Sequence, residues 1–336
     1  MAAMKLSRGR LEKVWRSPWT RILGTVVGLL VVAHSINLGR TVSGLVSADP
    51  VWVVVGVAFT ALTVFASVGE WGFLVRAGGH KLTWRALTSW YFQGLFVGQI
   101  FPAAIGGDAM RAVELGKVTG PGRALASLAG SRMAGTLGMA AWGLAGAFVL
   151  RGWLGSAGII GAALFLVGML IAWLAALNAD TVVQRIGNSS LLHRVARMLA
   201  PFTGAFGDYR HKPRAIALSL LVGGAGWGLN LLAMEVFGRA LGMQVNWLVF
   251  AVAIPISLVA TLSPVTFNGI GIREGLLVAL LTHVGVTAAK AAAFAIFVDF
   301  QMIPFAMLGG IVWMLHRRAH QDPALAPAPV ALPVRR

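Results

Sequence analysis

The sequence contains no cysteine among its 336 residues. This absence excludes disulfides, thiolate nucleophiles, iron–sulfur clusters and cysteine-ligated zinc. Charged residues are also scarce, because they make up only 12% of the chain, whereas a soluble domain carries roughly 25%. Hydrophobic residues account for 57%, and the mean hydropathy is +0.78. A chain with so few charged residues cannot form a water-soluble surface, so we predict a membrane protein.

Several apolar runs approach the roughly 20 residues that a helix needs to cross a bilayer. These runs do not alternate between apolar and polar residues, which argues against an outer-membrane barrel. We therefore predict an all-α, polytopic helix bundle in one transmembrane domain over 22–316, with about six full spans and two re-entrant or broken hairpins. The runs lie at 22–38, 51–75, 86–101, 124–150, 154–177, 215–238, 247–263, 275–287 and 291–315. A signal peptide is the alternative for the first run, but no clear small-x-small cleavage site follows it.

Acidic residues are few, at 11 against 28 lysines and arginines, and the net charge is +17. The N-terminal segment 1–21 alone holds six basic residues. If this segment is cytoplasmic and 86–101 is re-entrant, 22 of the 28 basic residues face the cytoplasm, as the positive-inside rule requires. A full crossing by 86–101 would instead place 178–214 outside. We expect both termini to be cytoplasmic in the cell membrane, although 86–101 and 247–287 could each be re-entrant or spanning.

The positive charge then forms a collar that favours anionic lipid headgroups, and no nucleic-acid partner is expected. Segment 180–212 mixes apolar and basic residues and is predicted to lie along the inner surface as an amphipathic helix; a solvated connector is the alternative. The Pro- and Ala-rich tail 317–336 is predicted to be disordered. No cofactor, metal site or nucleophilic triad is expected.

Two stretches place proline, glycine, arginine and a carboxylate together inside this apolar chain. They are "FPAAIGGDAMRAVELGK" at 101–117 and "LSPVTFNGIGIREG" at 262–275. In each, a glycine follows the proline by five residues and an arginine follows it by nine. The matching residues are Pro102, Gly107 and Arg111 in the first stretch and Pro264, Gly269 and Arg273 in the second, accompanied by Asp108 and Glu274.

Paired breaks of this kind are typical of inverted-repeat transporters, in which they mark the substrate site. A broken helix is tolerated at membrane depth only where it lines a cavity or is buried in protein. The free N–H groups at the following helix start attract anions, and arginine binds phosphate with two donors. We therefore predict a paired phosphate site with backbone contacts from Gly106–Gly107 and Gly269–Gly271. Interfacial loops whose arginines snorkel beside neutralising acids are the alternative.

Three other features bear on a site. Glu70 and Arg76 lie near one end of a span, so local pairing is favoured over a functional role. Asp299 lies deeper, needs a partner, and is a candidate cavity or proton-coupling residue. The glycines of "LVGGAGWGLNLLA" indicate close helix packing.

The motifs "PAAIGGDAMRAVELGK" and "SPVTFNGIGIREG" resemble those of the lysylphosphatidylglycerol synthase transmembrane-region family, whose members are also described as flippase-like. The resemblance extends from the first helix to about residue 315. The stretch "ASLAGSRMAGTLGMA" is similar to the family's next segment, with Arg132 as its arginine. Ser131 stands where members often carry an acid, which weakens an ion pair there.

The resemblance implies lipid translocation, with aminoacyl-phospholipid, polyprenyl-linked and hopanoid lipids as candidate cargo. The chain as given holds no segment that could form the soluble synthase domain, so we expect a flippase for a phosphate-bearing lipid, without enzyme activity. The alternatives are an intramembrane transferase acting on a lipid phosphate and a non-catalytic partner of a separate lipid-modifying enzyme. The expected substrate-binding residues are Pro102, Gly106, Gly107, Asp108, Arg111, Arg132, Pro264, Asn268, Gly269, Gly271, Arg273 and Glu274, with Asp299 as the candidate coupling residue.

Overall fold

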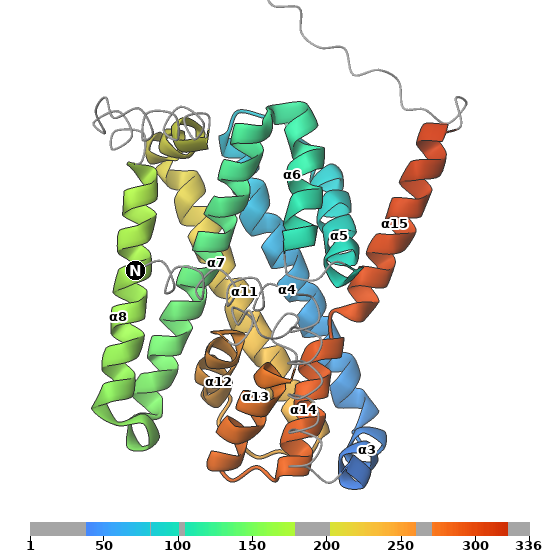
Figure 1. Cartoon of the computed structure of the whole chain (residues 1–336), viewed down its shortest axis with the longest axis vertical. Helices are drawn as coiled ribbons and strands as arrows, with labels where there is room; N and C mark the ends of the chain where they lie inside the picture. Colours follow the sequence, from blue (N-terminus) through green and yellow to red (C-terminus); the bar gives the residue numbers. More distant parts are fainter. Residues whose placement is uncertain (1–37, 81, 101–104, 179–201, 260–270, 322–336) are drawn as a thin grey trace, which may run out of the picture.

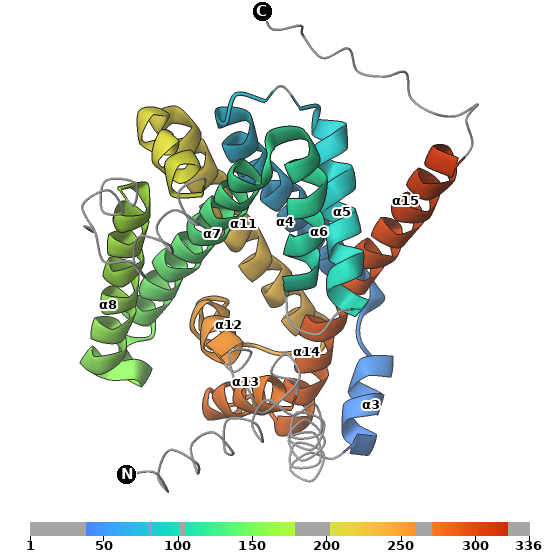
Figure 2. The same ribbon diagram turned by 45° about the horizontal axis from the view of Figure 1, so that its top comes forward.

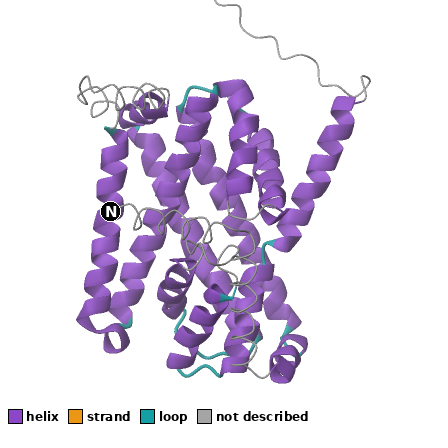
Figure 3. Ribbon diagram, in the orientation of Figure 1, coloured by secondary structure: helices purple, strands orange, loops and turns teal. Residues whose placement is uncertain are grey.

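The computed structural model describes residues 38–80, 82–100, 105–178, 202–259 and 271–321. Within these ranges the chain is helical, without strands, as the composition predicted (Figure 3). The elements are α3 (Leu38–Val46), α4 (Pro50–Ala77), α5 (Trp84–Ile100), α6 (Ile105–Thr119), α7 (Pro121–Val149), α8 (Arg151–Leu177), the 3₁₀ helix η1 (Asp208–His211), α11 (Pro213–Ala240), α12 (Leu248–Val259), α13 (Ile272–His283), α14 (Ala288–Phe300) and α15 (Ile303–Gln321).

Four stretches of the described chain are long and apolar enough to cross a membrane. They are Pro50–Ala77, Arg151–Leu177, Pro213–Ala240 and Ala288–Leu315. A helix of 28 residues is about 42 Å long, which exceeds the roughly 30 Å of hydrocarbon in a bilayer. Large apolar side chains cover the outside of α8, as the exposed Ile160, Leu164 and Ile171 show. The chain is thus a multi-pass membrane protein, while the number of six spans stays a prediction.

Helix α7 is 29 residues long and extends beside α8 along the bundle (Figure 1). It is not among the four most apolar stretches. Its sequence includes Arg123 and Arg132, and the second of these lies near the middle of the helix. An arginine at that depth needs a polar environment.

The last predicted span, 291–315, is divided into α14 and α15 by a turn at Gln301 and Met302. Pro304 explains the division, because proline has no N–H and its ring would clash with the carbonyl group of Phe300 in a continuous helix. The proline was visible in the sequence, but the hydropathy of the run hid the break.

Two pairs of short helices occupy opposite halves of the molecule. Helices α5 and α6 pack against each other in the upper half, whereas α12 and α13 lie in the lower half (Figures 1 and 2). The segments that join them, 101–104 and 260–270, lie outside the described residues. Each pair contains one of the two predicted motifs. The relation of these hairpins by an inverted repeat stays a prediction.

Close helix packing at glycine, predicted from the glycine-rich runs, is confirmed where α7 meets α11. A Cβ atom on Gly138 would lie 2.9 Å from the Cα atom of Gly224. Helix α11 also packs along α4, where the ring of Phe237 covers Gly56. The bundle therefore brings the middles of α4, α7 and α11 together.

Only the end of the predicted amphipathic segment 180–212 is described. Residues 202–207 are helical and lead into η1. The rings of Phe202, Phe206 and Tyr209 pack in series, and Phe206 also meets Trp173 of α8. This end of the segment is thus part of the bundle. The first predicted span, 22–38, is outside the described residues apart from Leu38, and α15 extends to Gln321, into the beginning of the predicted tail.

Candidate functional site

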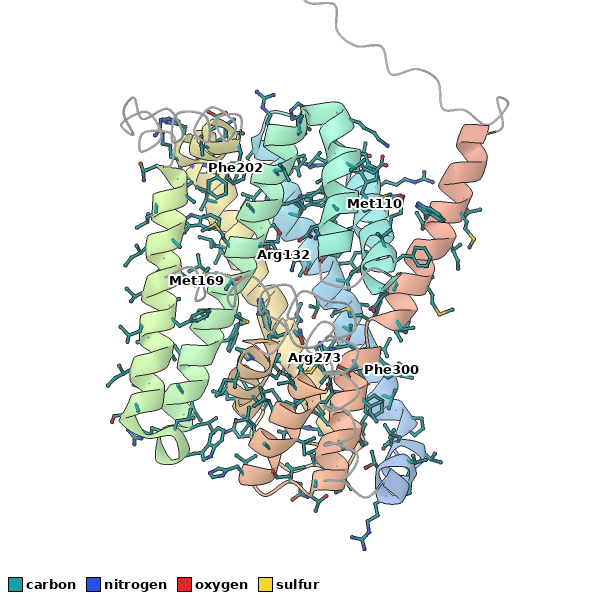
Figure 4. The ribbon with its side chains drawn as sticks, in the orientation of Figure 1. Met110, Arg132, Met169, Phe202, Arg273 and Phe300 are labelled. Atoms are coloured by element: carbon teal, nitrogen blue, oxygen red, sulfur yellow. The ribbon has the colours of Figure 1, made fainter. Side chains whose placement is uncertain are left out.

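A cavity of about 470 Å³ lies between α4, α5, α6, α7 and α11. Its lining comes from the middle of each long helix: 63–70 of α4, 131–136 of α7 and 223–230 of α11. We call this the central cavity. Two of these helices, α4 and α11, are long and apolar enough to cross a membrane, and the cavity lies near their middles. The position of Arg132 in Figure 4 is consistent with this depth.

Charged side chains from three helices line the central cavity. Arg111 of α6 pairs with Asp108, one turn earlier on the same helix. The second oxygen of Asp108 accepts from Arg132 of α7 at 2.7 Å. One carboxylate therefore links two arginines, and the charge of this triad is +1. Because Ser131 stands in place of an acid, the sequence predicted a weak ion pair at Arg132. In the structure Asp108 supplies the acid that pairs with Arg132.

Aromatic rings hold the guanidinium group of Arg111 in place. It lies 4.6 Å from the ring centre of Tyr91 and 5.4 Å from that of Trp71. Such contacts stabilise a cation by about 0.5–2 kcal/mol. Arg111 is 9% exposed, whereas the side chain of Arg132 is 58% exposed. Arg111 is thus the fixed arginine of the triad and Arg132 the accessible one.

Glu70 also lines the central cavity, which corrects the expected pairing with Arg76. Its side chain accepts a hydrogen bond from Ser131 Oγ at 3.0 Å. Arg76 instead donates to the carbonyl oxygen of Leu82 at 2.9 Å and lies over the ring of Trp84. The reason is helical geometry, because residues six apart do not share a face. Sequence reasoning underestimated Glu70, although a carboxylate within an apolar run was itself the signal.

Glycines allow the helices around the cavity to approach closely. A Cβ atom on Gly107 would lie 2.5 Å from the carbonyl oxygen of Gly94, so the two residues pin α6 against α5. A Cβ atom on Gly223 would lie 3.0 Å from Glu70 Oε2. Gly107 was predicted to cradle a phosphate. It does line the cavity, at the positive N-terminal end of α6, and it also has this packing role.

The second motif forms a separate cluster at the start of α13. Arg273 pairs with Asp299 of α14, and its Nε lies 3.2 Å from Glu274 Oε1. The other oxygen of Glu274 accepts from the N–H of Gly271, whose φ of 89° suits glycine. Asp299 thus has the partner that its depth required. Arg273 lies between two carboxylates, and the Gly271 N–H group is already bonded.

The described residues of the two motifs do not line one cavity together. None of Gly271, Arg273, Glu274 and Asp299 is among the described residues that line the central cavity, and Figure 4 shows Arg273 nearer the lower end than Arg132. Gly106 lies in the first turn of α6 but is not a lining residue. Four predicted residues lie outside the described ranges: Pro102, Pro264, Asn268 and Gly269.

Sequence reasoning missed several residues of the cavity wall. Tyr91 lines the cavity and holds Arg111 together with the buried Trp71 behind it, and Asn230 and Trp227 extend the polar wall on α11. The described residues contain no group of histidines and carboxylates arranged to hold a metal ion. The arginine and carboxylate groups of the central cavity are suited to recognising charge.

These features define a polytopic helical membrane protein that encloses a charged cavity between its membrane-spanning helices. Comparison with known families matches residues 20–310 to the lysylphosphatidylglycerol synthase TM region. The chain therefore belongs to this family, as its motifs suggested. Membership indicates a membrane protein involved in lipid handling. A comparison with curated proteins found no match.

Proposed function

We propose that this protein is a transporter that moves a phosphate-bearing lipid across the membrane, with the headgroup passing through the central cavity. The observation that carries the proposal is a cavity of about 470 Å³ with two arginines at mid-depth among membrane-spanning helices. Charged residues within a membrane are costly and mark substrate pathways. The proposal includes no chemical step.

The headgroup phosphate would bind the arginine pair. An arginine has five N–H donors, and Asp108 engages only part of those on Arg111 and Arg132. A phosphate would add to this triad, attracted by its net positive charge and by the N-terminal end of α6. Glu70 of α4, which also lines the cavity, would contact a cationic group of the same headgroup. This arrangement suits a headgroup with phosphate at one end and an amine at the other.

The second cluster has a different role in this proposal. Arg273 is balanced by Glu274 and Asp299, so the cluster has a formal charge of −1 and offers little attraction to phosphate. We assign it to holding α13 against α14 in this conformation. Asp299 stays the candidate coupling residue, because its protonation would leave Arg273 paired with Glu274 alone.

The positions of the basic residues indicate how the protein is oriented in the membrane. Four helix termini lie together at the upper end in Figure 1: the C-terminal ends of α4 and α6 and the N-terminal ends of α7 and α11. Arg76, Arg123 and Arg214 belong to these termini. By the positive-inside rule this end is cytoplasmic. Hairpin α5–α6 then enters from the cytoplasm and α12–α13 from outside. An inverted repeat of this kind would let the two hairpins open the cavity alternately.

The test is lipid movement in proteoliposomes, followed by dithionite quenching of headgroup-labelled anionic and zwitterionic lipids. Arg111→Ala and Arg132→Ala are expected to slow transport at least tenfold, which corresponds to about 1.4 kcal/mol of lost transition-state binding. The matched control is Arg239→Ala, which removes the same charge from an exposed pair with Glu235. Wild-type rates in both cavity variants, with normal folding by gel filtration, would overturn the proposal.

A further inference from the structure

A second cavity, of about 300 Å³, lies at the upper end of the molecule. It is bounded by the C-terminal ends of α4 and α6, the first turns of α7, and the chain from residue 205 to 212. We call it the end cavity. Among the described residues, it shares no lining residue with the central cavity. Its volume corresponds to about ten water molecules at about 30 Å³ each, which is more than a phosphate group needs.

Basic side chains outnumber acidic ones among the described residues that line the end cavity. Arg123 and Lys212 carry full charges, and His80 and His211 add two imidazole rings. Arg123 Nη1 lies 3.4 Å from His80 Nε2. Asp208 is the one carboxylate among the described lining residues. Burial and the charge of Arg123 lower the pKa of His80, which favours the uncharged ring.

Tyr209 supplies a donor with no partner among the described residues. It lines the end cavity and is only 4% exposed, yet its hydroxyl forms no hydrogen bond with another part of the described chain. The ring is fixed edge-on against Phe206, with centroids 5.7 Å apart. Burial raises the pKa of Tyr209, so the hydroxyl keeps its proton. The hydroxyl is not among the fully buried, unpaired polar atoms of the described chain, so it is open to the cavity and can donate to a ligand there.

Two helix starts border the same cavity. Arg123 is in the first turn of α7, and Lys212 is the residue before α11. Neither helix has a side-chain cap, and each begins with a proline. Their positive ends therefore add to the side-chain charge near the cavity.

We propose that the end cavity is a phosphate-binding site, distinct from the central cavity, in which Arg123, Lys212 and the Tyr209 hydroxyl bind the anion. Two sources carry this chemistry: the headgroup of an anionic phospholipid in the adjacent leaflet and free phosphate from the aqueous phase. The site does not depend on the transport proposal, because its residues lie outside the central cavity.

The test uses the full chain in neutral detergent at pH 7.5, with ¹³C-labelled histidine. The resonances of His80 and His211 report on the end cavity alone, so binding in the central cavity cannot imitate the signal. The two probes are inorganic phosphate and short-chain phosphatidic acid, with short-chain phosphatidylcholine as the lipid control. Each is titrated against constant ionic strength.

The structure predicts saturable shifts of both histidine resonances. Arg123→Gln should raise the dissociation constant at least tenfold, and Tyr209→Phe should raise it a few-fold while keeping the packing of the ring. Arg214→Gln is the matched control, since it removes the same charge from an exposed residue of α11 that does not line the cavity. It should bind like the wild type.

The outcomes separate the sources and the proposals. Binding of phosphatidic acid alone assigns the site to a lipid headgroup, whereas binding of both probes assigns it to the phosphate group itself. Absence of saturable shifts with either probe would overturn the inference. So would an equal loss of affinity in Arg214→Gln, because the effect would then come from overall charge. Neither of these two results would count against the proposal of transport through the central cavity.

Discussion

At the scale of single residues, two arginines in matching motifs have different surroundings. Arg111 lies over Tyr91 and lines the central cavity, while Asp108 links it to another arginine. Arg273 instead lies between two carboxylates. The matching offsets predicted equivalent roles. They could not show that a carboxylate 26 residues later in the chain would compensate the second arginine.

Loss of the second arginine should reduce stability more than it affects headgroup binding. Arg273→Ala leaves Asp299 and Glu274 without their shared cation, and we expect a cost of about 1–3 kcal/mol. The measurement is thermal unfolding of the purified protein in detergent. Arg239→Ala, which breaks an exposed pair, should cost less than about 1 kcal/mol.

The double variant Arg273→Ala/Asp299→Asn tests the cause of this loss. Removing one negative charge along with the arginine should recover part of the stability. A double variant that is no more stable than Arg273→Ala would contradict the view that unpaired carboxylates cause the loss.

At the scale of elements, the short helices depend on glycine contacts that hold them against their neighbours. Gly107 meets Gly94 between α6 and α5, and Gly309 of α15 meets the carbonyl oxygen of Phe92 on α5. A side chain at either position would separate the helices. The wall of the central cavity formed by α5 therefore depends on both contacts.

Gly309→Ala is expected to destabilise the protein by about 1–3 kcal/mol, because the added methyl group would overlap backbone rather than a mobile side chain. Gly168→Ala is the matched control. Gly168 lies in α8, where an added methyl group would meet no other atom within 4 Å, and alanine there should stabilise the helix by up to about 1 kcal/mol. Both can be compared by thermal unfolding; equal shifts would contradict the account of α5–α15 packing.

Sequence reasoning located most elements because hydropathy and helix breakers are local properties. Each motif region does begin between two short helices and continues into the second of them, α6 or α13. The break between α14 and α15 was missed, although Pro304 was its local signal. The fold class followed from composition alone. In a chain with 12% charged residues, apolar helices must either be buried in protein or face lipid.

At the scale of the whole molecule, the central cavity could not be located from the sequence. It depends on which faces of α4, α7 and α11 meet, and this is a property of tertiary packing. Arg111 and Asp108 were predicted as site residues and do line it. Glu70 was assigned to another partner, because its closest cation in sequence is not its neighbour in space. The proposed function depends on this polar cavity being open to water and closed to lipid.

The absence of cysteine makes this feature directly measurable. A single cysteine placed at Thr136, a lining residue of the central cavity, can be labelled in proteoliposomes with a membrane-impermeant maleimide. Gly168→Cys, on the exposed face of α8, is the lipid-facing control. The account predicts that Thr136→Cys reacts, that Gly168→Cys does not, and that a phosphate-bearing lipid slows the first reaction while a lipid without phosphate does not. An unreactive Thr136→Cys, or one whose labelling no lipid changes, would contradict it.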